Sequence, residues 1–298
     1  MYFKKKISDL FLDSFIFFSL ILLAFVTLYP FLNSLAISLN KADDTALGGI
    51  TIYPRKFTID NYKIIFSNPT LFRAYIITIS RTLIGAASSV LATAMFAFGM
   101  SKSYLKGKKF YMTMCIITMY FNGGLIPSYM LIRTLGLTNN FLVYIIPNLV
   151  SVFNMIIMRT FFRSIPEAIE ESAKIDGASL FRIFFKIIFP LSTPIVATIA
   201  LFNGVFHWNS WFDAAIYITD QKLKPVQSIL VSVINASRFQ EALAKAGAAA
   251  EHLGRMNKIN SRSLTMATMV TTVIPIIMVY PFLQKYFIKG IMIGSVKE

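Results

Sequence analysis

Apolar stretches long enough to cross a lipid bilayer constrain this chain more than any other feature of its sequence. A transmembrane helix needs about 20 predominantly apolar residues. The sequence offers six such stretches, at residues 10–39, 71–100, 110–132, 141–162, 190–218 and 264–288. Apolar residues make up 56% of the 298 residues and charged residues only 14%, a composition far from that of a soluble globular domain. We therefore expect an all-α membrane protein with six transmembrane helices.

The distribution of lysine indicates how the chain is oriented. Lys4, Lys5 and Lys6 precede the first apolar stretch, and residues 101–110 hold four more lysines. Short cytoplasmic loops are enriched in Lys and Arg, so we expect both segments inside the cell. The first stretch is too long for the apolar core of a cleaved signal peptide. We therefore expect residues 1–9 to be a cytoplasmic N-terminus, and residues 10–298 to form one transmembrane domain that ends in a cytoplasmic tail, residues 289–298.

Two longer polar segments are expected on the outer side. Residues 40–70 contain a predicted turn at Asp60-Asn61-Tyr62, and residues 219–262 form a second polar segment. Residues 240–252 of this second segment are rich in alanine and have high helix propensity, but almost no apolar face. A surface helix and a partly disordered segment both fit this pattern.

Residue types that carry enzymatic or metal chemistry are scarce in this sequence. It has two histidines and one cysteine, and it has no G-x-x-x-x-G-K-[ST] stretch that would hold the phosphates of ATP. The net charge of +15 is spread between the apolar stretches and is not gathered on one stripe with aromatic residues. We therefore expect no metal site, no catalytic site and no nucleic-acid partner. A membrane enzyme or a sensor scaffold stays as the alternative from another functional class.

Residues 164–190, here called the hairpin segment, interrupt the apolar pattern with a predicted helix, turn and helix. Ser164 and Glu167 fit a capping box, and Pro166 stands in the first helical turn, where proline is tolerated. Asp176-Gly177 predicts the end of this helix, because glycine adopts the left-handed conformation at low cost. Ser179 then caps a second helix that runs to Pro190.

The second arm of the hairpin segment is amphipathic. Its apolar residues follow the spacing i, i+3, i+4, i+7, and its basic residues lie on the opposite side. These apolar residues are Phe181, Phe184, Phe185 and Ile188. The residues around the turn are small, so a second protein could approach the backbone closely. Two interpretations are open at this point: a docking knob for a partner protein, or a hairpin that lies on the inner leaflet.

Polar residues within the apolar stretches are candidates for lining a pathway. Arg81 lies well inside the second stretch, and it is expected either to face a cavity or an acidic partner or to extend its charge toward the outer surface. Asn122, with Gly123-Gly124, and Asn148, after Pro147, mark breaks that need protein or a cavity to satisfy the freed backbone. The further candidates of this kind are Asn154 and Asn203.

An aromatic cluster near the end of the fifth stretch has two interpretations. If the helix is continuous, His207 and Trp211 share one face at i, i+4, and Asn209 and Asp213 lie on a neighbouring one. Together with Trp208, these stacking and hydrogen-bonding groups suit a sugar. An ordinary aromatic belt at the membrane interface fits the same residues.

The hairpin segment resembles the EAA loop of the membrane subunits of ABC importers. Glu171-Ser172-Ala173, Gly177, Ile187 and Phe189-Pro190 stand at every spacing of that motif, with Ser172 in place of alanine and Phe189 in place of leucine. In that family the loop is a coupling helix that fits a cleft in the ATPase subunit. The residues that the resemblance assigns to this coupling are Glu171, Ser172, Ala173, Asp176, Gly177, Ala178, Phe181 and Pro190.

The resemblance extends over nearly the whole chain. Further matching stretches are Gly123-Gly124-Leu125-Ile126-Pro127, Arg159-Thr160-Phe161-Phe162, His207-Trp208-Asn209 and Tyr280-Pro281-Phe282-Leu283. They are similar to carbohydrate ABC permeases of the MalG-like group, the inner membrane components of binding-protein-dependent transport systems, and within this group to the LplC/YtcP subgroup. Glu298 stands where the subgroup commonly has glycine.

The resemblance implies a fold, a location and a set of partners. The fold would be the type I ABC importer (MetI/MalG-like) permease fold, in the lipid of a bacterial cell membrane. The chain would pair with a second, LplB-like permease, dock on two ATPase subunits that bind ATP and Mg, and receive an oligosaccharide from an extracytoplasmic solute-binding lipoprotein. The chain itself would hold no cofactor. An importer for another polar solute, a peptide or a modified lipid, is the alternative within transport.

The resemblance also assigns a role to the C-terminal tail. In the maltose transporter the corresponding tail reaches the ATPase interface. The residues expected to do so here are Gly294, Ser295, Val296 and Lys297.

Overall fold

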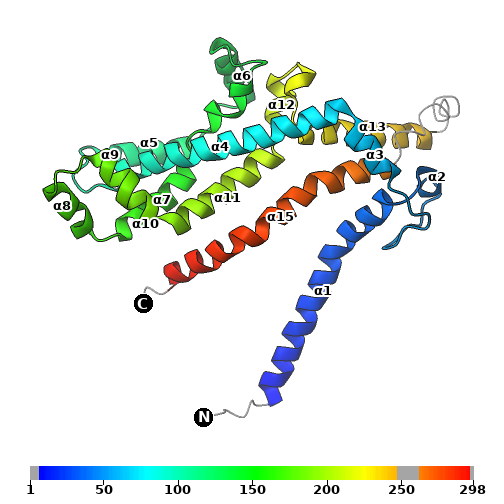
Figure 1. The fold of residues 1–298 in the computed structure, drawn as a ribbon, viewed down its shortest axis with the longest axis horizontal. Helices are drawn as coiled ribbons and strands as arrows, with labels where there is room; N and C mark the ends of the chain where they lie inside the picture. Colours follow the sequence, from blue (N-terminus) through cyan, green and yellow to red (C-terminus); the bar gives the residue numbers. More distant parts are fainter. Residues whose placement is uncertain (1–6, 247–261, 296–298) are drawn as a thin grey trace. The chain divides into compact units, whose positions relative to one another are not determined.

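The computed structural model of the chain describes residues 7–246 and 262–295, and every regular element within these ranges is a helix (Figure 1). The chain divides into two compact units, Met1–Asn68 with Ser232–Ile274, and Pro69–Val231 with Pro275–Glu298. The first unit contains α1 (Ile7–Ser38), α2 (Ala42–Thr45), α3 (Asp60–Ser67), the latter part of α13 (Val226–Ala246) and the first part of α15 (Arg262–Ser295).

The second unit contains the remaining helices. They are α4 (Pro69–Ser101), α5 (Lys108–Tyr120), α6 (Leu125–Thr134), η1 (Phe141–Tyr144), η2 (Ile146–Asn148), α7 (Val152–Ser164), α8 (Glu167–Ile175), α9 (Leu180–Ile183), η3 (Phe184–Ile188), α10 (Phe189–Leu191), α11 (Thr193–Asn209), α12 (Phe212–Tyr217) and η4 (Gln221–Leu223).

In the first unit, a buried asparagine organises the connection that follows α1. Asn40 accepts a hydrogen bond from the Lys56 backbone N–H at 2.7 Å and donates one to Asp44 at 3.0 Å. The hydrogen bond from Asn40, together with the Arg55 side chain 3.0 Å away, holds the pKa of Asp44 below its usual value. Residues 60–62, expected to form a turn, instead begin α3, since an acidic residue such as Asp60 stabilises a helix N-terminus.

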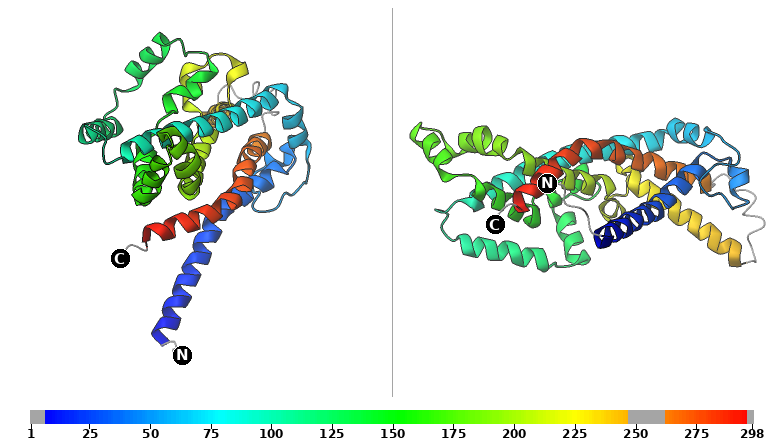
Figure 2. Two further views of the ribbon diagram at one scale, coloured as in Figure 1. Left: turned by 60° about the vertical axis from the view of Figure 1, so that its left-hand side comes forward. Right: turned by 90° about the horizontal axis from the view of Figure 1, so that it is seen from below.

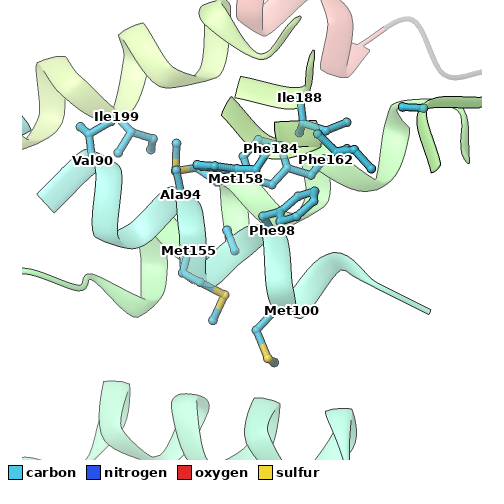
Figure 3. Packing of buried hydrophobic residues seen from close by; sticks show 13 residues of the cluster. Val90, Ala94, Phe98, Met100, Met155, Met158, Phe162, Phe184, Ile188 and Ile199 are labelled. Atoms are coloured by element: carbon cyan, nitrogen blue, oxygen red, sulfur yellow. The ribbon is translucent and has the colours of Figure 1, made fainter. Parts of the chain in front are cut away.

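The second unit is built around α4. Figure 1 shows α4 and α11 side by side, and α7 packs against α4 as well. The main hydrophobic core joins these helices to the hairpin segment through Val90, Ala94, Phe98, Met155, Met158, Phe162, Phe184, Ile188 and Ile199, among others. Figure 3 shows the rings of Phe98, Phe162 and Phe184 gathered in this core. With 33 residues and no proline after its first position, α4 is a straight element of about 50 Å.

Two of the predicted breaks are present in the second unit. At Asn122-Gly123-Gly124 the chain turns by 113° between α5 and α6, and Figure 1 shows α6 pointing away from α5. After Pro147-Asn148 a bend of 49° leads into α7. A third bend, of 84°, separates the second arm of the hairpin segment from α11.

Among the described residues, three helices are long and apolar enough to cross a membrane, and the number reaches six if each bent pair counts as one span. The fifth span differs from its predicted extent, residues 190–218. The helix α11 begins at Thr193 and ends at Asn209, and α12 begins only at Phe212. The predicted continuous helix at residues 207–213 is therefore wrong. The polar segment 219–262 contains η4 and α13, and its remaining part, residues 247–261, lies outside the described residues.

Candidate functional site

The hairpin segment lies at the carboxyl end of α4, as both views of Figure 2 allow the reader to follow. Its first helix, α8, begins after Pro166, and no side chain caps it. The predicted capping box is wrong, because Ser164 still belongs to α7 and its hydroxyl donates to the Phe161 carbonyl at 2.7 Å. Glu167 and Glu170 in the first turn remain favourable partners of the helix dipole.

The predicted turn at Asp176-Gly177 is confirmed. Gly177 has a φ of 73°, in the left-handed region. Its N–H donates to the Lys174 carbonyl at 3.0 Å, and the Ala178 N–H donates to the Ala173 carbonyl at 2.9 Å. These two bonds form a Schellman motif, which satisfies carbonyls at the end of α8. The backbone of the turn is therefore fixed without any partner protein.

The second arm starts as predicted, with the Ser179 hydroxyl accepting the Arg182 N–H at 3.4 Å. It then departs from an α-helix, since η3 is a π-helical turn in which the Phe189 N–H donates to the Phe184 carbonyl. Because the π-helical turn has more residues per turn than an α-helix, the residues at i, i+3, i+4 and i+7 no longer point in one direction. Phe184 and Ile188 are buried in the core of this unit, whereas Phe181 and Phe185 are exposed, so the four residues do not share one face as predicted.

The predicted coupling residues of the hairpin segment differ in how far they are exposed. Ala173 is buried, Ala178 is half-buried, and the other coupling residues are exposed. These exposed residues are Glu171, Ser172, Asp176, Gly177, Phe181 and Pro190. Ile175, which the sequence did not single out, is 86% exposed next to the turn, more than any other large apolar residue whose exposure the structure describes. An exposed apolar tip on a fixed backbone has the form of a docking surface.

Sequence reasoning missed an ion pair that fastens α8 to the end of α4. Glu170 pairs with Lys102, whose ammonium also lies 3.8 Å from the centroid of the Phe98 ring, and with Lys174 at 2.9 Å. Burial favours a higher pKa for Glu170, but hydrogen bonds from both lysines hold the pKa below its usual value. The hydrogen bond with Glu170 in turn raises the pKa of Lys174. A cleft of about 270 Å³ borders all three charges, so solvent reaches the cluster.

A second group of candidate residues meets inside the unit, around Arg81. The Arg81 side chain is completely buried, and it donates to both carboxylate oxygens of Asp213, at 2.6 and 3.2 Å. It also donates to the Ser210 carbonyl at 3.1 Å, and its guanidinium carbon lies 4.2 Å from the centre of the Tyr144 ring. The prediction of an acidic partner for Arg81 is confirmed, and the alternative of a side chain extended to the surface is wrong.

Next to this pair, His207 packs directly on α4. A Cβ added at Gly85 would lie 2.5 Å from His207 Nε2, so only glycine leaves room for the ring. His207 is fully buried, and neither ring nitrogen has a hydrogen-bond partner in the described part of the chain. One turn earlier on α11, Asn203 accepts a hydrogen bond from Ser89 at 3.1 Å. These residues form a buried helix contact, so His207 and Asn203 do not line an open surface.

The remaining pathway candidates do not converge on one place. Trp211 is 40% exposed. Trp208 is half-buried, and Asn209 is exposed. Asn122 is exposed at the bend after α5, whereas Asn154 is buried in α7. Asn148 donates to the Tyr144 carbonyl at 3.4 Å.

The tail residues are only partly covered by the structure. Gly294 and Ser295 end α15, and Val296 and Lys297 lie outside the described residues.

The chain is similar to known membrane proteins along nearly its whole length. The chain is 35% identical over 294 residues, 99% of both chains, to the polygalacturonan/rhamnogalacturonan transport system permease protein YtcP of Bacillus subtilis. It is 38% identical over 280 residues, 91% of this chain and 90% of the relative, to protein LplC of the same organism. A chain from the crystal structure of a bacterial ABC transporter involved in the import of the acidic polysaccharide alginate matches with a TM-score of 0.84 and 28% identity, covering 96% of this chain and 100% of that chain. Residues 2–293 match the family model of the binding-protein-dependent transport system inner membrane component, and the chain belongs to this family.

Proposed function

We propose that this chain is the permease subunit of an ATP-driven importer for oligosaccharides, and that it forms the translocation pathway with a second permease. The observation that carries the proposal is the likeness to YtcP over 99% of both chains. Among further relatives, permeases named for arabinooligosaccharides and galactooligosaccharides support the substrate class. Two of the similar proteins are named for acidic polysaccharides, so oligosaccharides of uronic acids are the first substrates to test.

The hairpin segment supports a role in coupling to separate ATPase subunits. Its tip exposes Ile175 and Phe181, while Phe184 and Ile188 fix its base in the core of the unit. A rigid hairpin with an apolar tip can transmit a displacement of a partner without bending. In this proposal ATP binding closes two ATPase subunits, the hairpin segment moves with them, and the pathway opens toward the outside. There a solute-binding lipoprotein releases the sugar.

In this proposal the partners carry out the ATP chemistry, and this chain forms part of the transport pathway. ATP and Mg would bind to the ATPase subunits, and the permease would hold no cofactor. The basic segment 101–110 next to the hairpin segment supports a cytoplasmic position for both, and hence for both termini. The tail residues Gly294, Ser295, Val296 and Lys297 would form a further contact with the ATPase.

The test is transport by the assembled complex. The chain is purified with its co-purifying permease and ATPase and placed in proteoliposomes with the solute-binding protein. ATP-dependent uptake is measured for oligogalacturonates, alginate oligomers, neutral oligosaccharides and peptides. Uptake of an oligosaccharide supports the proposal, and uptake of peptides alone assigns the importer to another solute. A chain that purifies with neither an ATPase nor a second permease contradicts it.

A further inference from the structure

We infer that the ion pair between Arg81 and Asp213 is a positioning device that sets where the segment 209–213, with its exposed side chains Asn209 and Trp211, lies along the proposed translocation pathway. The inference rests on the proposed function, because it concerns how the imported oligosaccharide is read. Neither residue is proposed to touch the sugar. Each acts through the segment that the pair holds in place.

The segment needs such a partner because its helix is interrupted. The helix α11 ends at Asn209, and Ser210 has an extended backbone with φ of −73° and ψ of 126°. The end of a helix leaves backbone carbonyls without a partner inside the helix, and where water is excluded another part of the protein must satisfy them. Here Arg81 donates to the freed Ser210 carbonyl at 3.1 Å, and Asp213 accepts the Ala214 N–H at 2.8 Å. The pair therefore binds the backbone on both sides of Trp211.

Residues of α4 also hold two further points of the chain, Tyr144 at the end of η1 and Val226 at the start of α13. The Tyr144 ring lies under the Arg81 guanidinium, and its hydroxyl donates to the Leu223 carbonyl at 2.9 Å. One helical turn before Arg81, the Thr78 hydroxyl accepts the Val226 N–H at 2.9 Å. One straight helix thus fixes the segment around Tyr144, the interruption at Ser210 and the start of α13. The guanidinium is the centre of this arrangement.

The geometry of the pair favours positioning over a general gain in stability. Replacing a buried ion pair by apolar residues of similar size is often neutral for stability, because both charges lose their hydration when they are buried. A bidentate contact between a planar guanidinium and a carboxylate does, however, fix distance and orientation. Asn209 and Trp211 precede Asp213 in the same segment, and both side chains are exposed, although the Asn209 amide donates to the Val205 carbonyl at 2.9 Å. Moving the anchor would therefore move both side chains.

Two variants separate positioning from stability. Asp213→Glu keeps the charge but lengthens the anchor by one methylene group. The double variant Arg81→Met with Asp213→Leu removes both charges together. Lys63→Met is the matched control, because it breaks the exposed pair with Asp60 in the other unit. Each complex is assayed in proteoliposomes for its amount, for ATP hydrolysis stimulated by the loaded binding protein, and for uptake of a short and a long oligomer of the transported sugar.

We expect the ratio of long to short oligomer uptake to change on the order of tenfold in the assembled variants, because displacements of about 1 Å suffice for such effects in binding sites. Stimulated ATP hydrolysis and the Lys63→Met ratio should stay at wild-type values. An assembled variant that keeps the wild-type ratio overturns the inference. Failure of both variants to assemble also overturns it, since the pair would then be a folding requirement. A wild-type complex that imports no oligosaccharide refutes the proposed function instead.

Discussion

At the residue scale, two glycines are required for different physical reasons. Gly177 needs its positive φ of 73°, and an added Cβ would meet no atom within 4 Å. Gly85 has helical backbone geometry, and an added Cβ would collide with the His207 ring. The sequence motif indicated the first glycine through its position after Asp176. It did not indicate the second, because contact with a residue 122 positions away leaves no local pattern.

For Gly177, a small substitution tests the backbone alone. We predict that Gly177→Ala lowers the free energy of unfolding by about 1 kcal/mol, since the left-handed conformation costs that much or slightly more for an L-residue. The measurement is thermal unfolding of the purified complex. Gly204→Ala is the control, because Gly204 lies within α11 and has nothing within 4 Å of an added Cβ. Equal stability of Gly177→Ala and wild type would contradict the assignment of the turn.

For Gly85, the expected defect is steric. We predict that Gly85→Ala destabilises the complex by about 1 to 3 kcal/mol, the usual cost of overpacking a tight contact. The matched control is Gly99→Ala in the same helix, where an added Cβ meets nothing within 4 Å. The double variant Gly85→Ala, His207→Ala should recover much of the stability that Gly85→Ala loses, because the ring that collides with the added Cβ is gone. A neutral Gly85→Ala would show that His207 does not pack on this glycine.

At the scale of elements, local signals in the sequence account for where the helices of the hairpin segment begin and end. They do not account for which side of each helix is buried. The glycine turn and the Ser179 cap were predictable from residue type. The π-helical turn was not, because periodicity arguments assume one helical repeat throughout. In the same way, the interruption at Ser210 carries no proline or glycine. Its stabilising partner, Arg81, comes from α4, so only the tertiary structure shows why the helix stops there.

The contact between α8 and the end of α4 yields a prediction for Glu170 and Lys102. Their side chains are 12% and 13% exposed, so we expect a coupling energy of about 1 kcal/mol in a double-mutant cycle of Glu170→Gln and Lys102→Met. The cycle is measured by thermal unfolding of the purified complex. Lys106→Met is the control, an exposed lysine of the same loop. Additive effects of the two substitutions would mean that the pair does not fasten α8.

The contribution of Glu170 to the free energy of unfolding should also depend on pH. Its pKa in the folded chain lies below the usual glutamate value of 4.5. A group whose pKa is lowered by folding stabilises the fold above the unfolded pKa and loses this contribution as the pH falls through the folded pKa. We therefore predict that the stability difference between wild type and Glu170→Gln is constant near neutral pH and shrinks below about pH 4.5. A difference that grows on acidification would contradict the direction of the shift.

At the scale of the whole molecule, the all-helical membrane class followed from apolar stretches, because hydropathy and length are global properties of the sequence. The sequence also located the breaks at Asn122-Gly123-Gly124 and Pro147-Asn148, since glycine and proline act locally. Which buried polar residues meet could not be predicted. The stripe of Thr78, Arg81, Gly85, Ser89 and Thr93 on α4 was the available signal, as small and polar residues mark helix contacts in membranes.

The orientation of the chain can be tested independently of transport. We predict that both termini and residues 101–107 face the cytoplasm and that residues 133–140 face outside, as the distribution of lysine indicates. Single cysteines are introduced at Lys106 and Asn139 in a Cys115→Ser background and labelled with a membrane-impermeant maleimide in intact cells. Labelling at position 139 but not at position 106 is the expected result. The reverse pattern would place the hairpin segment outside and exclude its coupling role.

The coupling role of the hairpin segment can be tested by measuring ATP hydrolysis and oligosaccharide uptake by the reconstituted complex with Gly177→Arg. If the hairpin segment transmits the movement of the ATPase subunits, a bulky side chain on the exposed turn should abolish stimulation by the loaded binding protein, and uptake with it. The amount of the variant in the membrane should equal that of the wild type, because the turn lies outside the hydrophobic core. A Gly177→Arg complex that keeps wild-type stimulation and uptake would show that the hairpin segment does not couple transport to the ATPase subunits.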